Sequence, residues 1–308
     1  MNSVVQDKEK FMKSKLLILS LASTALLCSC MGKSSKGGKA SGKKISKEEA
    51  AAVIEDLKQK RVSLGNVNKF SFKTKSFLSL DGSITINDQK LDLGSNYNSE
   101  ILAEVSQPDY WVHVKTDAKY GDEPYNQETY EYVKDNKFYY ADDQGGDKEY
   151  TVSSGSAVES FKSSVDEIVE SINTVEESAF AYLTSGDSFD VNGLYTITLT
   201  YYSDGNGDLT VKGHAPLNYS GESSGVTLTY KGTADLIFVW NDYCFSNASI
   251  DFDYIVTTSN NESVKVKMSE EYTVSSSVNV TYPNLSEYTE KTSPVGSITS
   301  DTNIVYPN

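Results

Sequence analysis

The sequence predicts an α+β protein with one large, curved, antiparallel β-sheet and two helices packed on it, one N-terminal and one long and mid-chain. Two long regions alternate apolar and polar residues with period two, which is typical of strands that bury one face. A continuous apolar stripe with helical spacing separates the two regions. Short turn signals join successive strands, and strands joined in this way pair antiparallel.

The first helix is expected to begin at the capping box Ser46-Lys47-Glu48-Glu49. In such a box the serine side chain accepts a hydrogen bond from a free backbone donor, and the glutamate reaches back to the serine. The helix should run to about Val62, because Gly65 follows as a stop signal. Its apolar face would hold Ala50, Val53, Ile54 and Leu57.

The first strand region begins at Lys69, where apolar and polar residues start to alternate. Asp81-Gly82 predicts a turn after the first strand, and Asp135-Asn136 predicts a hairpin turn near the end of the region. The stretch Asp142–Asp147 is expected to be a loop that closes the region. The predicted strands are Lys69–Leu80, Ser83–Leu93, Glu100–Val105, Tyr110–Thr116, Thr129–Val133 and Lys137–Ala141.

A second capping box, Ser156 to Glu159, opens the longest predicted helix, residues 157–183. Its apolar residues recur at steps of three and four, so they form one stripe along a helix of about 40 Å. We expect the stripe to pack on the chain's own sheet, with a coiled-coil partner as the alternative. The acidic residues between, Glu176 among them, are expected to be solvated. The stripe consists of Val158, Phe161, Val165, Ile168, Ile172, Val175, Ala179 and Leu183.

The second strand region follows, and from about Ser286 it fades into a polar tail, residues 287–308. Neither region shows two sheets of its own, so one sheet over residues 46–286 is favoured over two lobes. The predicted strands are Tyr195–Tyr201, Asp208–Ala215, Val226–Tyr230, Leu236–Trp240, Ile250–Val256, Val264–Met268 and Tyr272–Val274.

The N-terminal segment has the pattern of an export signal: Lys13 and Lys15 precede an apolar run that ends in small residues. Leu27-Cys28-Ser29-Cys30 resembles a bacterial lipobox, which implies removal of residues 1–29 and lipid on Cys30. Asp7 and Glu9 are unusual in a signal, so Met12 is the predicted start. An ordinary signal peptide and a spanning helix are the alternatives.

Residues 30–45, rich in glycine, serine and lysine, are expected to form a flexible tether. The protein should therefore sit on the outer side of the cell membrane, held by lipid.

Composition excludes several classes of function. The chain of 308 residues has a net charge of −15, which argues against nucleic-acid binding because phosphates need basic partners. Only Cys244 follows Cys30, so no internal disulfide and no cysteine-based zinc site is expected in the mature chain. Cys244 lies between Tyr243 and Phe245, and we expect it to be a packed core residue.

The order of elements behind the lipobox resembles the LolA/LppX-type lipoproteins over roughly residues 46–285. This resemblance implies a half-barrel whose concave face is covered by helices and can hold acyl chains. The expected function is then the binding or carriage of a lipid or another hydrophobic ligand, in a cavity between helix 157–183 and the concave sheet. The resemblance implies no individual binding residue.

Three short motifs resemble sites of chemistry. Gly221 to Gly225 matches a nucleophile motif but leads into a strand instead of a helix, so a hairpin loop is favoured. Asp204, Asn206 and Asp208 have calcium-loop spacing, but Leu209 and Ala215 stand where glycine and glutamate are needed. A β-turn is the better interpretation there. Asp142, Asp143 and Asp147 are predicted to form a solvated loop, with weak binding of a cation as the alternative.

The two histidines, His113 and His214, are predicted surface residues without a catalytic partner. We therefore expect no catalytic residue, cofactor or metal ligand, and no enzyme. The alternative function rests on the 21 tyrosines. It is a surface-displayed interaction module that binds glycan or protein through a tyrosine-rich outer face.

Overall fold

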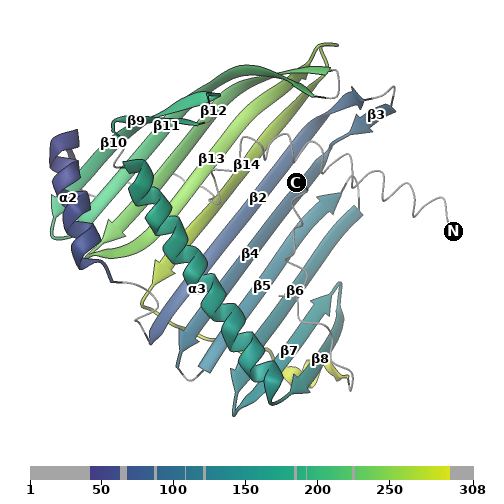
Figure 1. Ribbon diagram of the computed structural model, residues 1–308. Coiled ribbons are helices and arrows are strands. Elements are labelled where there is room, and N and C mark those ends of the chain that lie inside the picture. Colours follow the sequence, from purple (N-terminus) through teal and green to yellow (C-terminus); the bar gives the residue numbers. More distant parts are fainter. Residues whose placement is uncertain are drawn as a thin grey trace.

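The computed structural model describes residues 42–62, 68–86, 89–107, 109–120, 123–183, 186–191, 193–223 and 226–291. Within these residues the protein is mostly β: one open, largely antiparallel sheet with two helices, α2 (Lys47–Lys60) and α3 (Ser156–Leu183) (Figure 1). A short 3₁₀ turn, η2, spans Leu285–Glu287. The prediction of a single sheet with an N-terminal and a mid-chain helix is confirmed. Cys30 and the rest of residues 1–41 lie outside the described residues.

The described strands form one sheet of fifteen strands in the order β1-β10-β11-β12-β13-β14-β2-β4-β5-β6-β7-β8-β15, with β3 beside β2 and β9 beside β10. Neighbours are antiparallel except β15, which pairs parallel with β8. The bounds are β1 Lys43–Ile45, β2 Lys69–Ile86, β3 Gln89–Asp92, β4 Ser95–Ser106, β5 Asp109–Tyr120, β6 Glu123–Lys134, β7 Lys137–Gln144, β8 Asp147–Ser153, β9 Ser188–Val191, β10 Tyr195–Gly205, β11 Asp208–Ser223, β12 Val226–Asn241, β13 Cys244–Thr258, β14 Ser263–Ser275 and β15 Thr289–Glu290.

The pairing of β2 with β14 joins the two strand regions. Leu80 lies opposite Val266 and Phe72 opposite Val274, so β2, the first long strand of the chain, is hydrogen-bonded to β14, the last long strand. Ser76 Oγ adds a side-chain hydrogen bond to Glu270 Oε1 at 2.9 Å across the same pair. This pairing makes one sheet out of two regions that would otherwise be separate.

The start of α2 and the packing of α3 are as the sequence predicts, whereas α3 begins at Ser156 itself, the residue predicted to cap it. Ser46 Oγ accepts a hydrogen bond from Glu49 N at 3.2 Å, and Ser46 N donates to Glu49 Oε2 at 2.7 Å, which completes the capping box of α2. The apolar stripe of α3 faces the sheet, where Phe161 packs on Phe138 with ring centroids 5.0 Å apart. Its stripe residues are buried, apart from the partly buried Ile168. The packing of α3 on the chain's own sheet is therefore confirmed.

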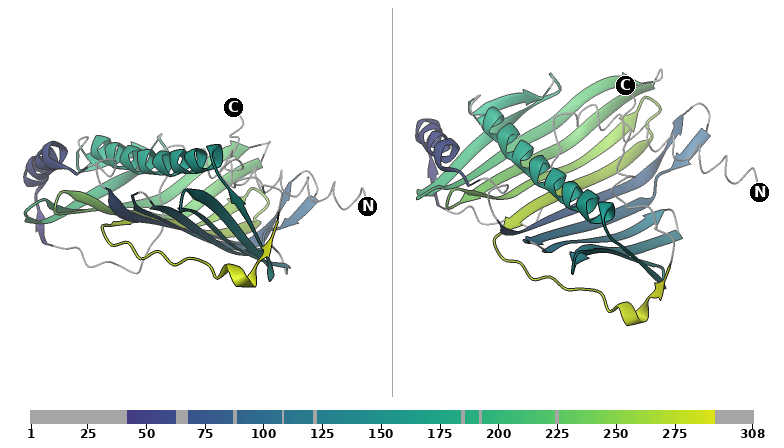
Figure 2. Two further views of the ribbon diagram at one scale, coloured as in Figure 1. Left: turned by 90° about the horizontal axis from the view of Figure 1, so that it is seen from below. Right: turned by 60° about the horizontal axis from the view of Figure 1, so that its bottom comes forward.

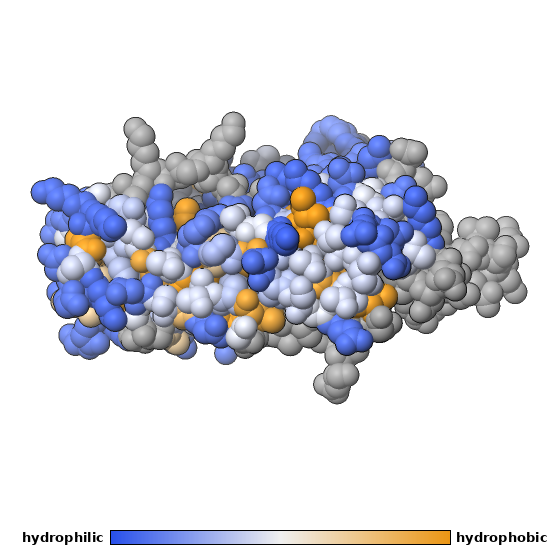
Figure 3. All heavy atoms as spheres, turned by 90° about the horizontal axis from the view of Figure 1, so that it is seen from above, coloured by the Kyte–Doolittle hydropathy of each residue, from blue (hydrophilic) through white to orange (hydrophobic). Residues whose placement is uncertain are grey.

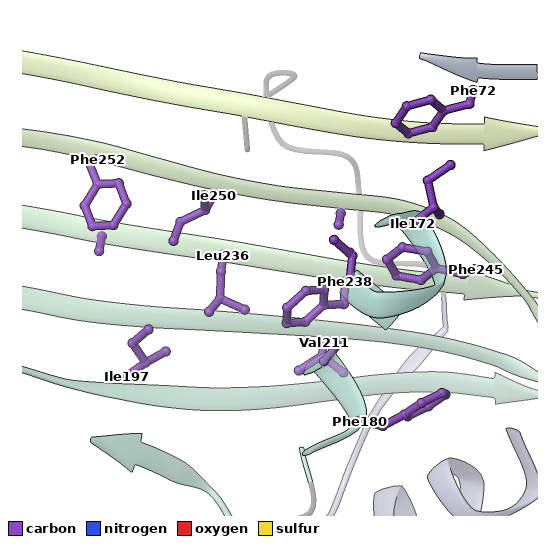
Figure 4. Packing of buried hydrophobic residues seen from close by; sticks show 14 of the residues in the cluster. Phe72, Ile172, Phe180, Ile197, Val211, Leu236, Phe238, Phe245, Ile250 and Phe252 are labelled. Atoms are coloured by element: carbon purple, nitrogen blue, oxygen red, sulfur yellow. The ribbon is translucent and has the colours of Figure 1, made fainter. Parts of the chain in front are cut away.

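We call the side of the sheet that α3 crosses the helix face, and the opposite side the outer face. Figure 2 shows α3 lying along one side of the sheet, while the C-terminal segment before β15 runs along the other side. Apolar residues alternate onto the helix face and form the core, and Figure 4 shows several of them on neighbouring strands. The part of the surface seen in Figure 3 is mainly polar, with small separate apolar spots.

The predicted turn at Asp81-Gly82 is wrong, because β2 continues through it to Ile86. Gly82 has φ +135°, and a Cβ there would lie 2.3 Å from the backbone oxygen of Ser263. The glycine is therefore explained by the close approach of β14 and not by a turn. The turns at Asp135-Asn136 and at residues 204–208 are confirmed, with left-handed φ values of 51° and 56° at the first two positions and 58° at Asn206.

Other boundaries also differ. Asp147 begins strand β8, where a loop was expected to end. Two pairs of short predicted strands are each one long strand, β12 and β14. Residues 43–45, predicted as tether, form β1 and pair with β10, and residues 289–290, predicted as tail, pair with β8.

A candidate ligand pocket beside the long helix

A pocket of about 270 Å³ lies at the rim of the sheet, against the second half of α3. Ile172 and Glu176 of α3 form one side of it. Phe70 from the start of β2, Val274 from the end of β14 and Phe245 from the start of β13 form the other. The pocket therefore lies between α3 and the helix face of the sheet.

The walls of the pocket are apolar and its mouth is polar. Phe70, Ile172 and Phe245 have exposed fractions of only 4%, 3% and 5%, so their contact surfaces are turned into the protein. Polar residues of the rim, including Asn173 and Asp242, also line it. Ligand sites commonly combine apolar walls with a few polar groups.

Glu176 is the one carboxylate of α3 on this wall, and it is only 3% exposed. Its Oε1 accepts a hydrogen bond from Trp240 Nε1 at 2.8 Å, and its Oε2 lies 3.5 Å from a guanidinium nitrogen of Arg61. Burial raises the pKa of Glu176, although Trp240 and Arg61 oppose this shift. The expectation that Glu176 is solvated is wrong, because Glu176 stands four residues after Ile172 and thus on the apolar stripe.

Arg61, which caps the end of α2, joins that helix to α3 near the pocket. Its second nitrogen lies 2.9 Å from Glu177, and its guanidinium lies 5.9 Å from the ring centre of Phe180. The end of α2 is thereby held to the last turns of α3. A second hollow, of about 280 Å³, lies on the other side of this contact and is lined by Lys58, Arg61, Glu177, Phe180 and Ala181.

Trp240 packs against two residues that line the pocket, Phe245 and Glu176. It is fully buried, and its ring lies 5.1 Å from Phe180, 5.3 Å from Phe245 and 6.2 Å from Phe238, centre to centre. Three rings and one hydrogen bond therefore fix its position. Because Phe245 and Glu176 both line the pocket, Trp240 sets the positions of two walls.

Cys244 also lines the pocket, but the prediction that it is a packed core residue is wrong. It is an exposed free cysteine at the first position of β13. Partial burial of the sulfur raises the pKa of the thiol, with Asp242 and Glu176 adding to the effect. The thiolate is thus disfavoured, so nothing here activates Cys244 as a nucleophile.

The other motifs of the sequence contribute nothing to this pocket. Gly221 lies at the end of β11, and the next strand begins at Val226, as expected for a hairpin. Asp208 Oδ1 accepts a hydrogen bond from the backbone of Asp242 and serves the turn. Asp142 and Asp143 lie in β7, which with β8 forms a hairpin through Gly145 and Gly146.

The histidines lie on the outer face of the sheet. His113 Nε2 lies 2.7 Å from Glu128 Oε1, and its ring stacks on Tyr130 with centroids 4.4 Å apart. His214 Nδ1 lies 2.7 Å from Asp235 Oδ1, and both residues are exposed. Each histidine thus has a carboxylate partner on a neighbouring strand, and neither lies at the pocket.

The tyrosines of the outer face are largely engaged within the chain. Tyr132 is 3% exposed and stacks on Tyr139 at 4.8 Å. Tyr282, from the C-terminal segment, packs edge-on against Tyr132 at 4.9 Å. Tyr130 stacks on His113. The rings of Tyr130 and Tyr132 on this surface therefore already have stacking partners within the chain.

No helix among the described residues has the length and apolar content needed to cross a membrane. Likewise, the described part of the chain has no group of three or more His, Cys, Asp or Glu side chains arranged to hold a metal ion. Comparisons with protein-family models, with curated proteins and with solved structures find no match for this chain. The resemblance to LolA/LppX-type lipoproteins thus rests on element order alone and stays a prediction.

Proposed function

We propose that the protein is an exported lipoprotein, anchored to the outer side of the membrane through lipid on Cys30, which binds a hydrophobic ligand beside α3. The observation that carries this proposal is the pocket itself. It lies between the long helix and the sheet, and Phe70, Ile172 and Phe245 supply apolar walls. Its volume is just below the range of about 300–1,000 Å³ typical of ligand sites, which suits a single acyl chain better than a bulky ring system.

The fold supports the same proposal by indicating which face of the sheet would hold the ligand. A long helix across one face of an open sheet is the arrangement from which a half-barrel with a covered concave face can be built. In such an arrangement, the helix face holds the ligand and the outer face meets solvent. The outer face is a weaker candidate because the rings of Tyr130 and Tyr132 already stack on partners within the chain.

Ligand binding is tested by native mass spectrometry of protein purified from membranes, and by titration with a fluorescent acyl-chain probe. Val274→Trp should fill the pocket from the half-buried end of β14 and weaken probe binding by about tenfold or more. Ile255→Trp is the matched control, because Ile255 lies on the outer face and is 45% exposed. Equal affinities of the two variants for the probe would refute this pocket as the binding site.

The anchor is tested separately by labelling cells with radioactive palmitate. The wild-type chain should incorporate label and enter the detergent phase, whereas Cys30→Ser should do neither. Cys28→Ser is the control and should behave like wild type. Unlabelled wild-type protein would remove the anchor and the membrane location from the proposal, but not the pocket.

A further inference from the structure

Charge is divided unevenly between the two faces of strands β4–β8. The lysines of these strands alternate onto the outer face, where Lys134 lies over Tyr282 and Lys148 over Tyr288. The helix face of the same strands carries acidic residues, namely Glu131, Asp142 and Glu149, the last of which pairs with Lys291. This part of the helix face is thus acidic and, among the described strand residues, free of basic side chains.

Strand register brings the polar side chains of this face together. Glu131 lies opposite Tyr140, which lies opposite Thr151, and in the next row Thr129 lies opposite Asp142. Side chains directly opposite each other have Cβ atoms about 4.5–5.5 Å apart. We call this group the acidic patch. It consists of Gln127, Thr129, Glu131, Tyr140, Asp142 and Thr151.

Two atoms of the acidic patch are buried without a partner. Glu131 is 4% exposed and its Oε2 makes no hydrogen bond, and Thr129 is 2% exposed and its Oγ1 makes none. A buried polar group without a partner costs about 1–3 kcal/mol, so each such group needs an explanation. Elsewhere, the buried Glu176 is satisfied by Trp240 and Arg61, and the half-buried Glu270 by Ser76. Glu104, on the outer face, is also buried with an unpartnered Oε2, but its Oε1 accepts a hydrogen bond from the backbone N–H of Asn279 at 2.8 Å.

No cation within the described part of the chain compensates Glu131. Burial alone raises its pKa to about 7, with no charged neighbour contributing to the shift. The pKa of Asp142 is also raised, by burial and by Asp143 and Glu149, although Gln127 donates a hydrogen bond to it. The nearby lysine of α3, Lys162, pairs with Glu159 and lies over the ring of Tyr110. Among the described residues, the patch therefore holds a buried carboxylate oxygen without a partner and no cation to match its charge.

We propose that the acidic patch binds the ammonium group of a cationic amphiphile, with Glu131 as its principal partner. An ammonium group is a donor without acceptors, so it can satisfy Glu131 Oε2 and Thr129 Oγ1 together. Tyr140 adds an aromatic ring, and aromatic rings attract ammonium ions. For the apolar part of the ligand, the inference rests on the proposed function: that part lies against α3 and the apolar residues of the helix face.

The test compares two probes with the same alkyl chain, dodecylamine and dodecanol, by calorimetric titration of the purified full chain at pH 8, below micelle-forming concentrations. The amine should bind about tenfold more tightly than the alcohol, the usual effect of one charge-assisted hydrogen bond. Glu131→Gln should remove that preference and leave dodecanol binding unchanged. Glu270→Gln, which removes a half-buried acid elsewhere on the same face, should leave the preference intact.

Each of the other possible results refutes either the ammonium site or the amphiphile as a whole. Equal binding of amine and alcohol, or an undiminished preference in Glu131→Gln, refutes the ammonium site while the proposed hydrophobic ligand stands. If Glu270→Gln also loses the preference for the amine, that preference comes from the net negative charge of the protein and not from Glu131, which also refutes the site. Absence of binding by both probes refutes the amphiphile and counts against the proposed function. Circular dichroism of each variant verifies that it is folded.

Discussion

The two halves of the sheet share one architecture but differ in what they bury. In β10–β14, which we call the apolar wing, the helix face carries residues such as Ile197, Leu236 and Ile250 (Figure 4). In β4–β8, the polar wing, it carries Thr129 and Glu131 at equivalent depth, 2% and 4% exposed. Both wings are antiparallel hairpins with matching alternation, so the fold does not require the difference.

The difference bears on stability and on the proposed ammonium site. Apolar burial contributes about 25 cal/mol per Å², so the apolar wing is the main source of the hydrophobic stabilisation of the fold. Buried polar atoms without partners lower stability and are kept in natural proteins chiefly at functional sites. In our proposal, the polar wing is therefore the part of the sheet where stability is given up for ligand binding.

The largest expected effect is in the apolar wing. Trp240→Ala should lower the free energy of unfolding by about 3–5 kcal/mol, because it removes a fully buried ring and leaves a cavity between α3 and β12. Urea unfolding followed by circular dichroism measures it. Ile255→Ala, on the exposed outer face, should cost about 0.5 kcal/mol or less. Similar costs for both variants would mean that the apolar wing does not dominate stability.

The next effect is in the polar wing and depends on pH. The pKa of Glu131 is raised to about 7 in the folded protein, so folding favours the protonated form. Its contribution to stability is complete below the ordinary pKa near 4.5 and is lost as pH rises through 7. The free energy of unfolding of Glu131→Gln, relative to that of wild type, should therefore rise by about 3 kcal/mol between pH 4.5 and pH 8.

Thermal unfolding at a series of pH values measures this difference for Glu131. Thr129→Val is the companion variant: it replaces an unpartnered hydroxyl by a methyl group, and its effect should be the same at every pH. A pH-independent difference between Glu131→Gln and wild type would show that the carboxylate is not buried as described.

The smallest effect concerns the outer face of the polar wing. Tyr282→Ala removes the edge-on contact with Tyr132 and the interaction with Lys134, which together should contribute about 1 kcal/mol. Limited proteolysis should then cut within residues 276–291 sooner, while the sheet stays intact. An unchanged cleavage rate would mean that the hydrogen bond from the backbone N–H of Asn279 to the Glu104 carboxylate and the pairing of β15 hold the segment without the ring.

Much of the fold follows from local signals in the sequence. The capping box at Ser46, the stripe from Val158 to Leu183 and the turn at Asp135-Asn136 each encode a structure through near neighbours. Strand existence also follows from alternation, because one face of each strand is buried. The joining of both regions in one sheet follows less directly, because the alternation favours it only in that neither region shows two sheets of its own.

What could not be predicted depends on partners distant in sequence. Gly82 indicates a turn locally, but its reason is Ser263 on another strand. Cys244 lies among apolar neighbours in sequence, yet it begins its strand at the rim and is exposed. Glu176 carried a usable signal, its spacing from Ile172, whereas its partners Trp240 and Arg61 could not be inferred. The unpartnered state of Glu131 likewise appears only once the strands are in register.

The bonding of β2 to β14 has a consequence for how the protein forms. Ser76 and Glu270, which meet across it, are 194 positions apart. During synthesis, one edge of β2 stays unpaired until β14 has been made, and an unpaired strand edge invites association with other chains. Such long-range closure is slow. Maturation of this protein should therefore depend on keeping one open edge protected until the last long strand arrives.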